Sequence, residues 1–358
     1  MGCYKPNFIV KHKIPLNVWS IRRFRDSKYS DFKVMKDKPY EYAFIPGSSL
    51  KEYRDFFRDW KEEDYELTPV PCGSCIGCRL DYSRDWATRC LLEAEQFKFN
   101  YFLTLTYDDV HLPKGNVQNA TLVPEDFTNF MKRLRIYFKR EFNHDNIRFF
   151  GCGEYGDSSF RPHYHIICFN LPIPDLTEEF RYIDENGHEV VTHHCKDGVI
   201  YYYSDIIHKL WNKGNVVIGE VTYQSCAYTA RYVVKKLKGN SAEAYDILGV
   251  VPPFVRMSRS PGLAYNYFIS KKEDIYDSDG FFVSTHQGAQ FVAPPRYFDK
   301  MYEIENELRF YQVKEDRKRR GNEYLNTLYE NTSLHYDDYL DLLENLKVLQ
   351  IKSLGRIL

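Results

Sequence analysis

The chain lacks any apolar run long enough to span a membrane, and its N-terminus has no hydrophobic segment followed by a cleavage site. We therefore expect a protein that is neither exported nor inserted in a membrane. It also lacks an excess of either charge, because 49 basic residues nearly balance 50 acidic ones. The resulting net charge of -1 neither supports nor excludes a nucleic-acid partner, since binding needs only a local basic surface.

The sequence also lacks the cysteine pattern of a secreted disulfide scaffold and the phosphate-binding loop of an ATPase. Its nine cysteines are an odd number, and three of them cluster within seven residues, Cys72–Cys78. This usage favours a reducing compartment. No GxxxxGK[ST] segment occurs, so we expect no nucleotide-binding motif of that kind.

Aromatic residues are abundant, with 30 Tyr and 25 Phe in a chain that is 43% hydrophobic. Most of these rings are expected in a packed core, and exposed ones suit the stacking of nucleic-acid bases. Hydrophobic periodicity predicts a mixture of strands and helices. We expect strands at 101–106, 147–153, 163–169, 216–221 and 255–258, and helices at 71–97, 124–140, 204–211 and 225–237.

The two ends of the chain differ from its middle. Residues 1–70 show no clear periodicity and are expected to be irregular. The region after Val292 is polar and helical, with a basic run at Arg317–Arg320 and a leucine-spaced segment from Leu340 to Leu349. We expect a Cys-rich N-terminal segment and helix at 1–98, a catalytic domain at 99–291 and a helical tail at 292–358.

The segment RPHYHIICF at 161–169 carries the sharpest chemical signal. Alternate side chains of a strand share a face, so His163 and His165 point the same way and can bind one divalent ion. A metal that acts on phosphate usually takes an oxygen ligand as well. If the two strands form a symmetric hairpin, Glu154 lies opposite His163, and Asp157 in the connecting loop is the second choice. Alone, such a pair is more often two ordinary histidines on a half-exposed strand.

The second signal is YTARYVVKK at 228–236. Tyr228 and Tyr232 are four residues apart, so their hydroxyls share one face of a helix. A phenol has a pKa of about 10 and needs a cation or a lysine nearby to attack a phosphate at neutral pH. Alone, two tyrosines on an amphipathic helix are ordinary in a chain with 30 Tyr. The order of the HxH strand, the carboxylate and the YxxxY helix strengthens the functional interpretation.

At these residues the sequence resembles the HUH endonuclease superfamily, and within it the replication initiators of small icosahedral single-stranded DNA phages (microviruses), especially the gokushovirus-like branch. The matching segments lie between about residue 71 and residue 262: PCGSCIGCR, SRDWATR, FLTLTYDD, GEYGD, RPHYHIICF, YTARYVVKK and MSRSPG. The resemblance implies an α+β fold with an antiparallel sheet flanked by helices. It implies a rolling-circle initiator that nicks single-stranded DNA at the phage origin, forms a 5′-phosphotyrosine link and rejoins the strand.

The resemblance also implies roles for single residues. It assigns metal ligation to two histidines and nucleophilic attack to two tyrosines, with a lysine beside them: His163, His165, Tyr228, Tyr232 and Lys235. Glu154 is a weaker transfer, because the third ligand varies in placement in this family. The expected catalytic cofactor is Mg²⁺ or Mn²⁺. Candidate DNA contacts are basic residues near these motifs and on the 124–140 helix: Arg161, Arg231, Lys236, Lys132 and Arg133.

The cysteine cluster predicts a second metal site. Cys72, Cys75 and Cys78 have the C-x2-C-x2-C spacing at which thiolates chelate zinc well and an iron–sulfur cluster less often. Structural zinc takes a fourth ligand. The segment MGCYKP resembles the N-terminal pattern of the phage initiators and implies Cys3, with Cys90 as the alternative. The expected role is structural.

Three functions stay open at this point. They are the phage initiator, a relaxase or transposase of the same superfamily, and a non-catalytic zinc-stabilised protein that binds nucleic acid through its basic helix and aromatic rings. Expected partners are single-stranded and origin DNA, together with a host helicase and polymerase, because the chain has no nucleotide-binding motif. The expected location is the cytoplasm of the bacterial host.

Overall fold

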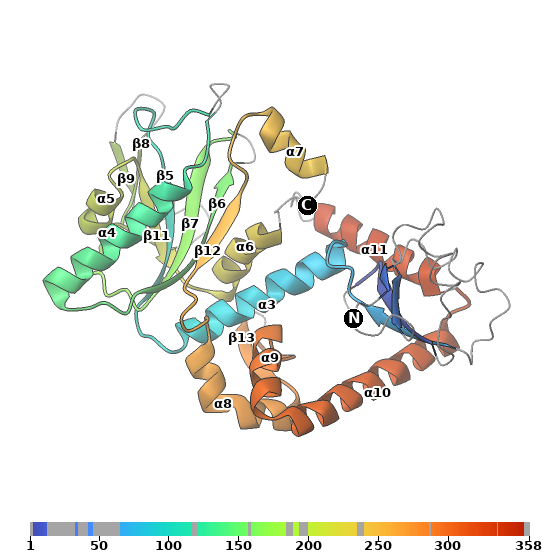
Figure 1. Cartoon of the computed structure of the whole chain (residues 1–358). Helices are drawn as coiled ribbons and strands as arrows, with labels where there is room; N and C mark the ends of the chain where they lie inside the picture. Colours follow the sequence, from blue (N-terminus) through green and yellow to red (C-terminus); the bar gives the residue numbers. More distant parts are fainter. Residues whose placement is uncertain are drawn as a thin grey trace. The chain divides into compact units, whose positions relative to one another are not determined.

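The computed structural model (Figure 1) describes residues 3–12, 33–34, 42–45, 65–115, 120–156, 159–183, 189–192, 200–234, 240–285, 288–334 and 336–353. The chain forms two compact units. Unit 1 comprises Met1–Tyr82 and Arg319–Leu358, and unit 2 comprises Ser83–Lys318. Within the described ranges, no helix combines the length and the apolar character that crossing a membrane requires.

Unit 2 is built on a six-stranded sheet in which every neighbouring pair of strands is antiparallel. In spatial order its strands are β10 (Tyr201–Tyr202), β11 (Val216–Glu220), β5 (Asn100–Thr106), β7 (Pro162–Phe169), β6 (Arg148–Tyr155) and β12 (Phe254–Met257). The five strands expected from the sequence are all present, with ends shifted by at most two residues. A mixed fold with an antiparallel sheet flanked by helices is thereby confirmed.

One face of this sheet is covered by α4 (Pro124–Phe142) and α5 (Asp205–Trp211). Pro at the first position suits the start of α4, and its predicted apolar stripe is buried: Phe127, Phe130, Met131, Leu134 and Phe138. Burial of each of these apolar side chains stabilises the fold by about 2 kcal/mol. From β7, Tyr164, Ile166 and Cys168 belong to the same core.

The opposite face is covered by α3 (Ile76–Ala94) and α6 (Tyr223–Val234), as Figure 1 shows. Trp86 of α3 stacks on Phe150 of β6 with ring centroids 5.1 Å apart. The start of α6 is capped reciprocally, because the Ser225 N–H donates to Thr222 Oγ1 and the Thr222 N–H donates to Ser225 Oγ. Ile167 of β7 faces this side, so the alternation of a strand places His163 and His165 here too.

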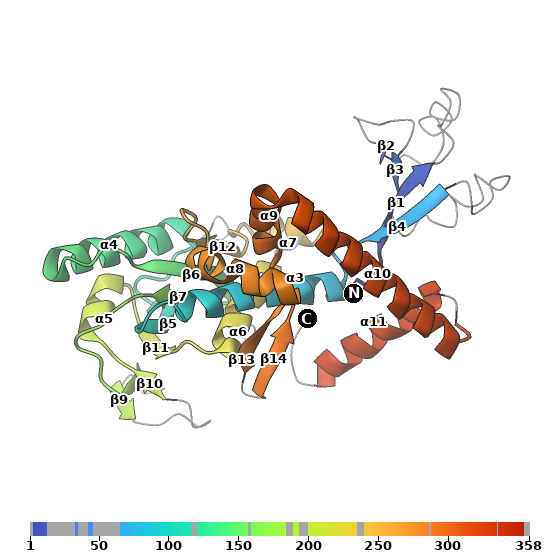
Figure 2. The ribbon, with the colours of Figure 1, turned by 90° about the horizontal axis from the view of Figure 1, so that it is seen from below.

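Besides the short strand β10, unit 2 contains further elements that the sequence argument did not assign. They are the hairpin β8 (Phe180–Ile183) and β9 (Glu189–Thr192), α7 (Asn240–Ile247), α8 (Tyr265–Ser278), and the hairpin β13 (Phe281–Thr285) and β14 (Gly288–Val292), seen from below in Figure 2. The helices expected after Val292 are confirmed as α9 (Arg296–Glu305), α10 (Glu307–Asn331) and α11 (Tyr336–Ser353). Helix α9 and the start of α10 bury Phe298, Tyr302 and Phe310 against α8.

Unit 1 corrects the expectation that residues 1–70 are irregular. Four strands pair there in the order β2 (Lys33–Val34), β3 (Tyr42–Ile45), β1 (Asn7–His12) and β4 (Tyr65–Val70). Strand β1 pairs antiparallel with β4 over its whole length, from Asn7 opposite Val70 to His12 opposite Tyr65. Within the same unit, Lys5 forms a 3.0 Å ion pair with Glu344 of α11, so the segment before β1 contacts this C-terminal helix.

Candidate active site

The β6–β7 hairpin gathers one carboxylate and two imidazoles. Its register places Glu154 directly opposite His163, as the symmetric-hairpin argument expected. Glu154 Oε1 lies 2.9 Å from His163 Nε2 and 2.9 Å from His165 Nε2. A single carboxylate oxygen therefore contacts the Nε2 atom of each of the two imidazole rings. Asp157, the second choice as oxygen ligand, lies outside the described residues.

Burial and hydrogen bonding set the charge states of these groups. Burial pushes the pKa of Glu154 upward, but the contacts from His163 and His165 outweigh it, so the carboxyl pKa lies below its ordinary value. For His165, burial is the largest influence and the pKa lies below its ordinary value despite the opposing contact with Glu154. At neutral pH the site thus holds an ionised carboxylate and a neutral His165, the forms that bind a metal.

The Nδ1 atoms of both histidines contact oxygen atoms on the side away from Glu154. His163 Nδ1 lies 3.0 Å from the carbonyl oxygen of Arg161, and His165 Nδ1 lies 3.0 Å from Thr104 Oγ1. A carbonyl can only accept, so Nδ1 of His163 carries a proton and donates it to the Arg161 carbonyl; when a cation occupies the site, Nε2 can then turn its lone pair toward the cation. Outer partners of this kind fix the tautomer of metal-binding histidines.

The donor set fits a divalent cation. Two ligands at right angles on an ion with bonds of about 2.1 Å lie about 3.0 Å apart, close to the 2.9 Å between the Glu154 oxygen and each imidazole nitrogen. The ligand atoms of Glu154, His163 and His165 all lie within 4.8 Å of one another. With two nitrogens and one oxygen, the set suits Mn²⁺ and tolerates Mg²⁺.

Helix α6 brings a tyrosine to the same place. Tyr228 Oη lies 3.4 Å from Glu154 Oε1. Its ring meets that of His165 edge to face, with centroids 5.1 Å apart and an interplanar angle of 87°. Tyr232 follows one turn later in α6, but its side chain and that of Arg231 are not described, and Lys235 and Lys236 lie outside the described residues. Among the described side chains, the structure thus joins Tyr228 to the histidines and the carboxylate.

The sequence argument missed two residues of β5 that position His165. Thr104 lies opposite His165 in the register and contacts its Nδ1 through the hydroxyl. Phe102 stacks on the His165 ring, with centroids 5.3 Å apart and an interplanar angle of 11°. The available signal was the alternation in FLTLT, which puts residues 102, 104 and 106 on one face of a strand.

Of the candidate DNA contacts, three are described. Two of them, Arg161 and Arg133, bind other parts of the protein, and two, Lys132 and Arg133, lie on the side of the sheet opposite the histidines. Arg161 donates to the carbonyl of Tyr107 through Nε and Nη2 at 3.2 and 2.8 Å, and pairs with Asp109 at 2.7 Å. Arg133 donates to the carbonyls at the end of α5. Lys132 is exposed, but it and Arg133 belong to α4, which covers the face of the sheet opposite the histidines.

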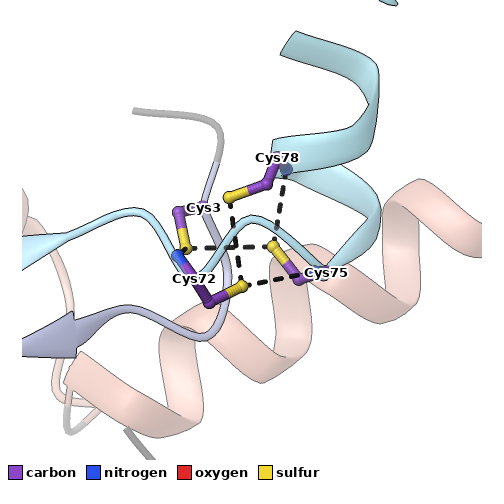
Figure 3. Close-up of side chains that lie close together, drawn as sticks. All are labelled: Cys3, Cys72, Cys75 and Cys78. Atoms are coloured by element: carbon purple, nitrogen blue, oxygen red, sulfur yellow. Dashed lines mark hydrogen bonds between the residues drawn. The ribbon is translucent and has the colours of Figure 1, made fainter. Parts of the chain in front are cut away.

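Four cysteines of unit 1 form a separate cluster (Figure 3). Cys3 Sγ lies 3.8 Å from Cys75 Sγ, and Cys72 Sγ lies 3.9 Å from Cys78 Sγ. These separations are far too long for disulfides. They match the edge of about 3.8 Å between sulfurs that surround a zinc ion tetrahedrally with bonds of about 2.3 Å.

Backbone amides favour the thiolate of Cys72, whereas burial raises the pKa of the Cys3 thiol to about 11 and raises that of Cys78 as well. The N–H groups of Ser74 and Cys75 lie 3.4 and 3.2 Å from Cys72 Sγ. Burial raises the pKa of the Cys72 thiol, but these donors outweigh it and bring the pKa down to about 6. Cys90, the alternative fourth ligand, is fully buried in the α3–α6 core of unit 2 beside Cys226, whereas Cys3 lies in the cluster.

Comparison with known proteins identifies relatives among phage proteins. Residues 100–237 match the family described as replication-associated protein ORF2/G2P. The chain is 40% identical to the replication-associated protein ORF2 of Spiroplasma virus 4 over 274 residues, which cover 76% of this chain and 80% of that protein. It is 34% identical over 235 residues to the replication-associated protein VP4 of Bdellovibrio phage phiMH2K, covering 65% and 67% of the two chains. No solved structure matches the chain.

Proposed function

Because the chain belongs to the family of replication-associated proteins of small single-stranded DNA phages, we propose that it starts rolling-circle replication by nicking single-stranded DNA with a tyrosine. One observation carries the proposal. Tyr228 Oη lies near Glu154 Oε1, the same carboxylate oxygen that lies 2.9 Å from Nε2 of both His163 and His165. A phenol held beside a cation site is placed to attack a phosphate whose charge that cation balances. We assign the sheet with its HxH strand to the HUH endonuclease class on the same ground.

The proposed nicking step transfers the scissile phosphoryl group from the 3′ oxygen of the DNA to the tyrosine oxygen. The Tyr228 phenol loses its proton, its oxygen bonds to the scissile phosphorus, and the bond from phosphorus to the 3′ oxygen breaks. The 3′ oxygen leaves with a proton and becomes the primer end, while the 5′ phosphate stays on the tyrosine. The reverse attack by a 3′-hydroxyl rejoins the strand and releases a circle. We assign the second attack to Tyr232 and the supporting positive charge to Lys235.

Glu154, His163 and His165 would hold the catalytic cation, for which Mg²⁺ or Mn²⁺ is the proposed identity. When bound, it supplies Lewis-acid stabilisation of charge on the phosphate oxygens. The protein's own residues orient the ligands for that cation. Thr104 and the Arg161 carbonyl orient the imidazoles, and Phe102 confines the His165 ring. Arg161, Arg231, Lys236, Lys132 and Arg133 stay proposed DNA contacts, with Arg161 nearest to the histidines in sequence.

We propose zinc as the occupant of the cysteine cluster, with Cys3 as its fourth ligand. The four sulfurs, the amide donors and the spacing of the thiols support this identity. The role is structural, because the site joins the start of β1 to the start of α3 within unit 1. A host helicase and polymerase in the bacterial cytoplasm are the proposed partners of the nicked DNA.

The test uses the full-length protein, a phage origin as single-stranded DNA, and Mn²⁺ or Mg²⁺. We expect a protein–DNA adduct that resists SDS and that chelation with EDTA abolishes. Tyr228→Phe should reduce it, the double change with Tyr232→Phe should abolish it, and His163→Ala should abolish it too. Tyr223→Phe is a matched control, because Tyr223 starts the same helix and is absent from the site.

The outcomes separate the candidate functions. An adduct that survives the double tyrosine change would remove the nucleophile assignment. Intact DNA binding with no adduct under any metal would favour a binding protein without catalysis. Cleavage of a plasmid transfer origin in preference to the phage origin would favour a relaxase.

A further inference from the structure

The loop that joins β6 to β7 holds an aromatic residue in an unfavourable backbone conformation. Phe160 has a φ of 50°, in the left-handed region, where the Cβ of a bulky residue crowds its own backbone. In the described part of the chain, the other non-glycine residues with positive φ all have short side chains: Asn143, Asn170, Asn212, Ala264 and Asp279. A large ring kept in such a conformation is a reason to look for a function.

Hydrogen bonds tie this loop to the metal-binding hairpin. The Phe160 N–H donates to the Gly156 carbonyl at 2.9 Å, and the Gly156 N–H donates to the Arg161 carbonyl at 3.0 Å. The same Arg161 oxygen accepts from His163 Nδ1. The backbone that fixes Phe160 is therefore the backbone that orients a proposed metal ligand.

The ring of Phe160 continues an aromatic stack. It lies parallel to Tyr155, with centroids 4.5 Å apart and an interplanar angle of 7°. Tyr155 is buried, and its hydroxyl donates to the Val251 carbonyl at 2.6 Å, so the supporting ring is held firmly. Phe160 itself is 40% exposed. One side of the ring is thus used by Tyr155, and the residue still presents apolar surface to solvent.

We propose that the exposed side of Phe160 is a stacking site for a nucleobase of bound single-stranded DNA. The identity of the ligand rests on the proposed function. A base fits because its flat π surface extends the parallel stack, and because stacking of this kind tolerates any base. Glu154 and Tyr155 are consecutive in β6 and point to opposite faces of the sheet, but the hydrogen bonds through the Arg161 carbonyl join this loop to His163 at the end of the hairpin. A strand whose phosphate meets the metal site can therefore pass around the end of the hairpin to Phe160. A protein partner fits less well, since one ring is far smaller than a stable protein interface.

The experiment measures binding, in EDTA, of two labelled strands of about 20 nucleotides, a length above the span of one binding site. One is oligothymidine, and the other is a fully abasic strand with the same phosphates. We expect Phe160→Ala to weaken oligothymidine binding roughly 5- to 150-fold, the range for loss of one base stack, and to leave abasic binding unchanged. Phe160→Trp should retain the preference for bases, whereas Phe160→Leu should lose it.

Phe142→Ala is the matched control, because Phe142 is similarly exposed at 47% but ends α4, where its ring contacts Tyr137 and Phe138 and not Tyr155. It should bind both strands as the wild type does. Equal losses for the two strands with Phe160→Ala would overturn the proposal, as would unchanged binding of both or a wild type that does not prefer bases. Because no step needs cleavage, a protein that forms no adduct can still confirm or refute the stacking site.

Discussion

Thr104→Val tests whether the hydroxyl behind His165 prepares the metal site. The change keeps the size of the side chain and removes the 3.0 Å contact with Nδ1. A neutral hydrogen bond is worth about 0.5–1.5 kcal/mol, and loss of an outer partner weakens metal binding about 10- to 100-fold. Thr104 is half-buried, so water can partly replace its hydroxyl. We therefore expect Thr104→Val to lower the affinity for Mn²⁺ by roughly tenfold, the lower end of that range, which corresponds to about 1.4 kcal/mol of binding free energy.

The assay is calorimetric titration of the full-length protein with Mn²⁺. Thr106→Val is the control, because Thr106 lies on the same face of β5, opposite His163, but its hydroxyl donates to the Asn215 carbonyl at 3.3 Å. His163 takes its outer contact from a backbone carbonyl instead, so this variant should bind Mn²⁺ within about threefold of wild type. Equal losses in both variants, or none with Thr104→Val, would refute the reasoning.

The remaining predictions concern the cysteine cluster of unit 1 and the Arg148–Glu93 ion pair of unit 2. Purified wild type should contain about one zinc ion per chain; Cys3→Ser should lower this content and the folded yield, and Cys90→Ser should keep the zinc, as elemental analysis would report. Zinc retained by Cys3→Ser but lost by Cys90→Ser would reverse the ligand assignment. Arg148→Met should destabilise unit 2 by about 3 kcal/mol, because it leaves the buried carboxylate of Glu93 without its ion pair. The melting temperature should then fall by about 6–12 °C. Arg135→Met, which removes contacts to a neutral carbonyl, should lower it less, and an equal fall would contradict the ion-pair explanation.

Local pattern predicted five of the six strands of the unit 2 sheet, all but the two-residue strand β10. The alternation of RPHYHIICF and the length of the preceding loop predict that Glu154 faces His163, because a short hairpin leaves few registers. The apolar stripe of α4 was equally readable, since its spacing follows the period of a helix.

Pattern could not predict features that depend on distant segments. Strand β1 pairs with β4, which begins more than fifty residues later, and nothing in NFIVKH alone reveals that partner. The pattern of α4 does not say which face of the sheet the helix covers, so it could not predict that its basic residues lie on the side opposite the histidines. Thr104 was missed for a similar reason, because its role arises only when β5 lies beside β7.

All three proposed cation ligands lie between Glu154 and His165, on one hairpin. Closing so short a stretch of chain costs little entropy and is fast compared with assembling the whole sheet. The tyrosine arrives from a helix more than sixty residues downstream. One local hairpin thus contributes every proposed cation ligand, whereas the proposed nucleophile reaches them only when the distant helix α6 packs on the same face of the sheet.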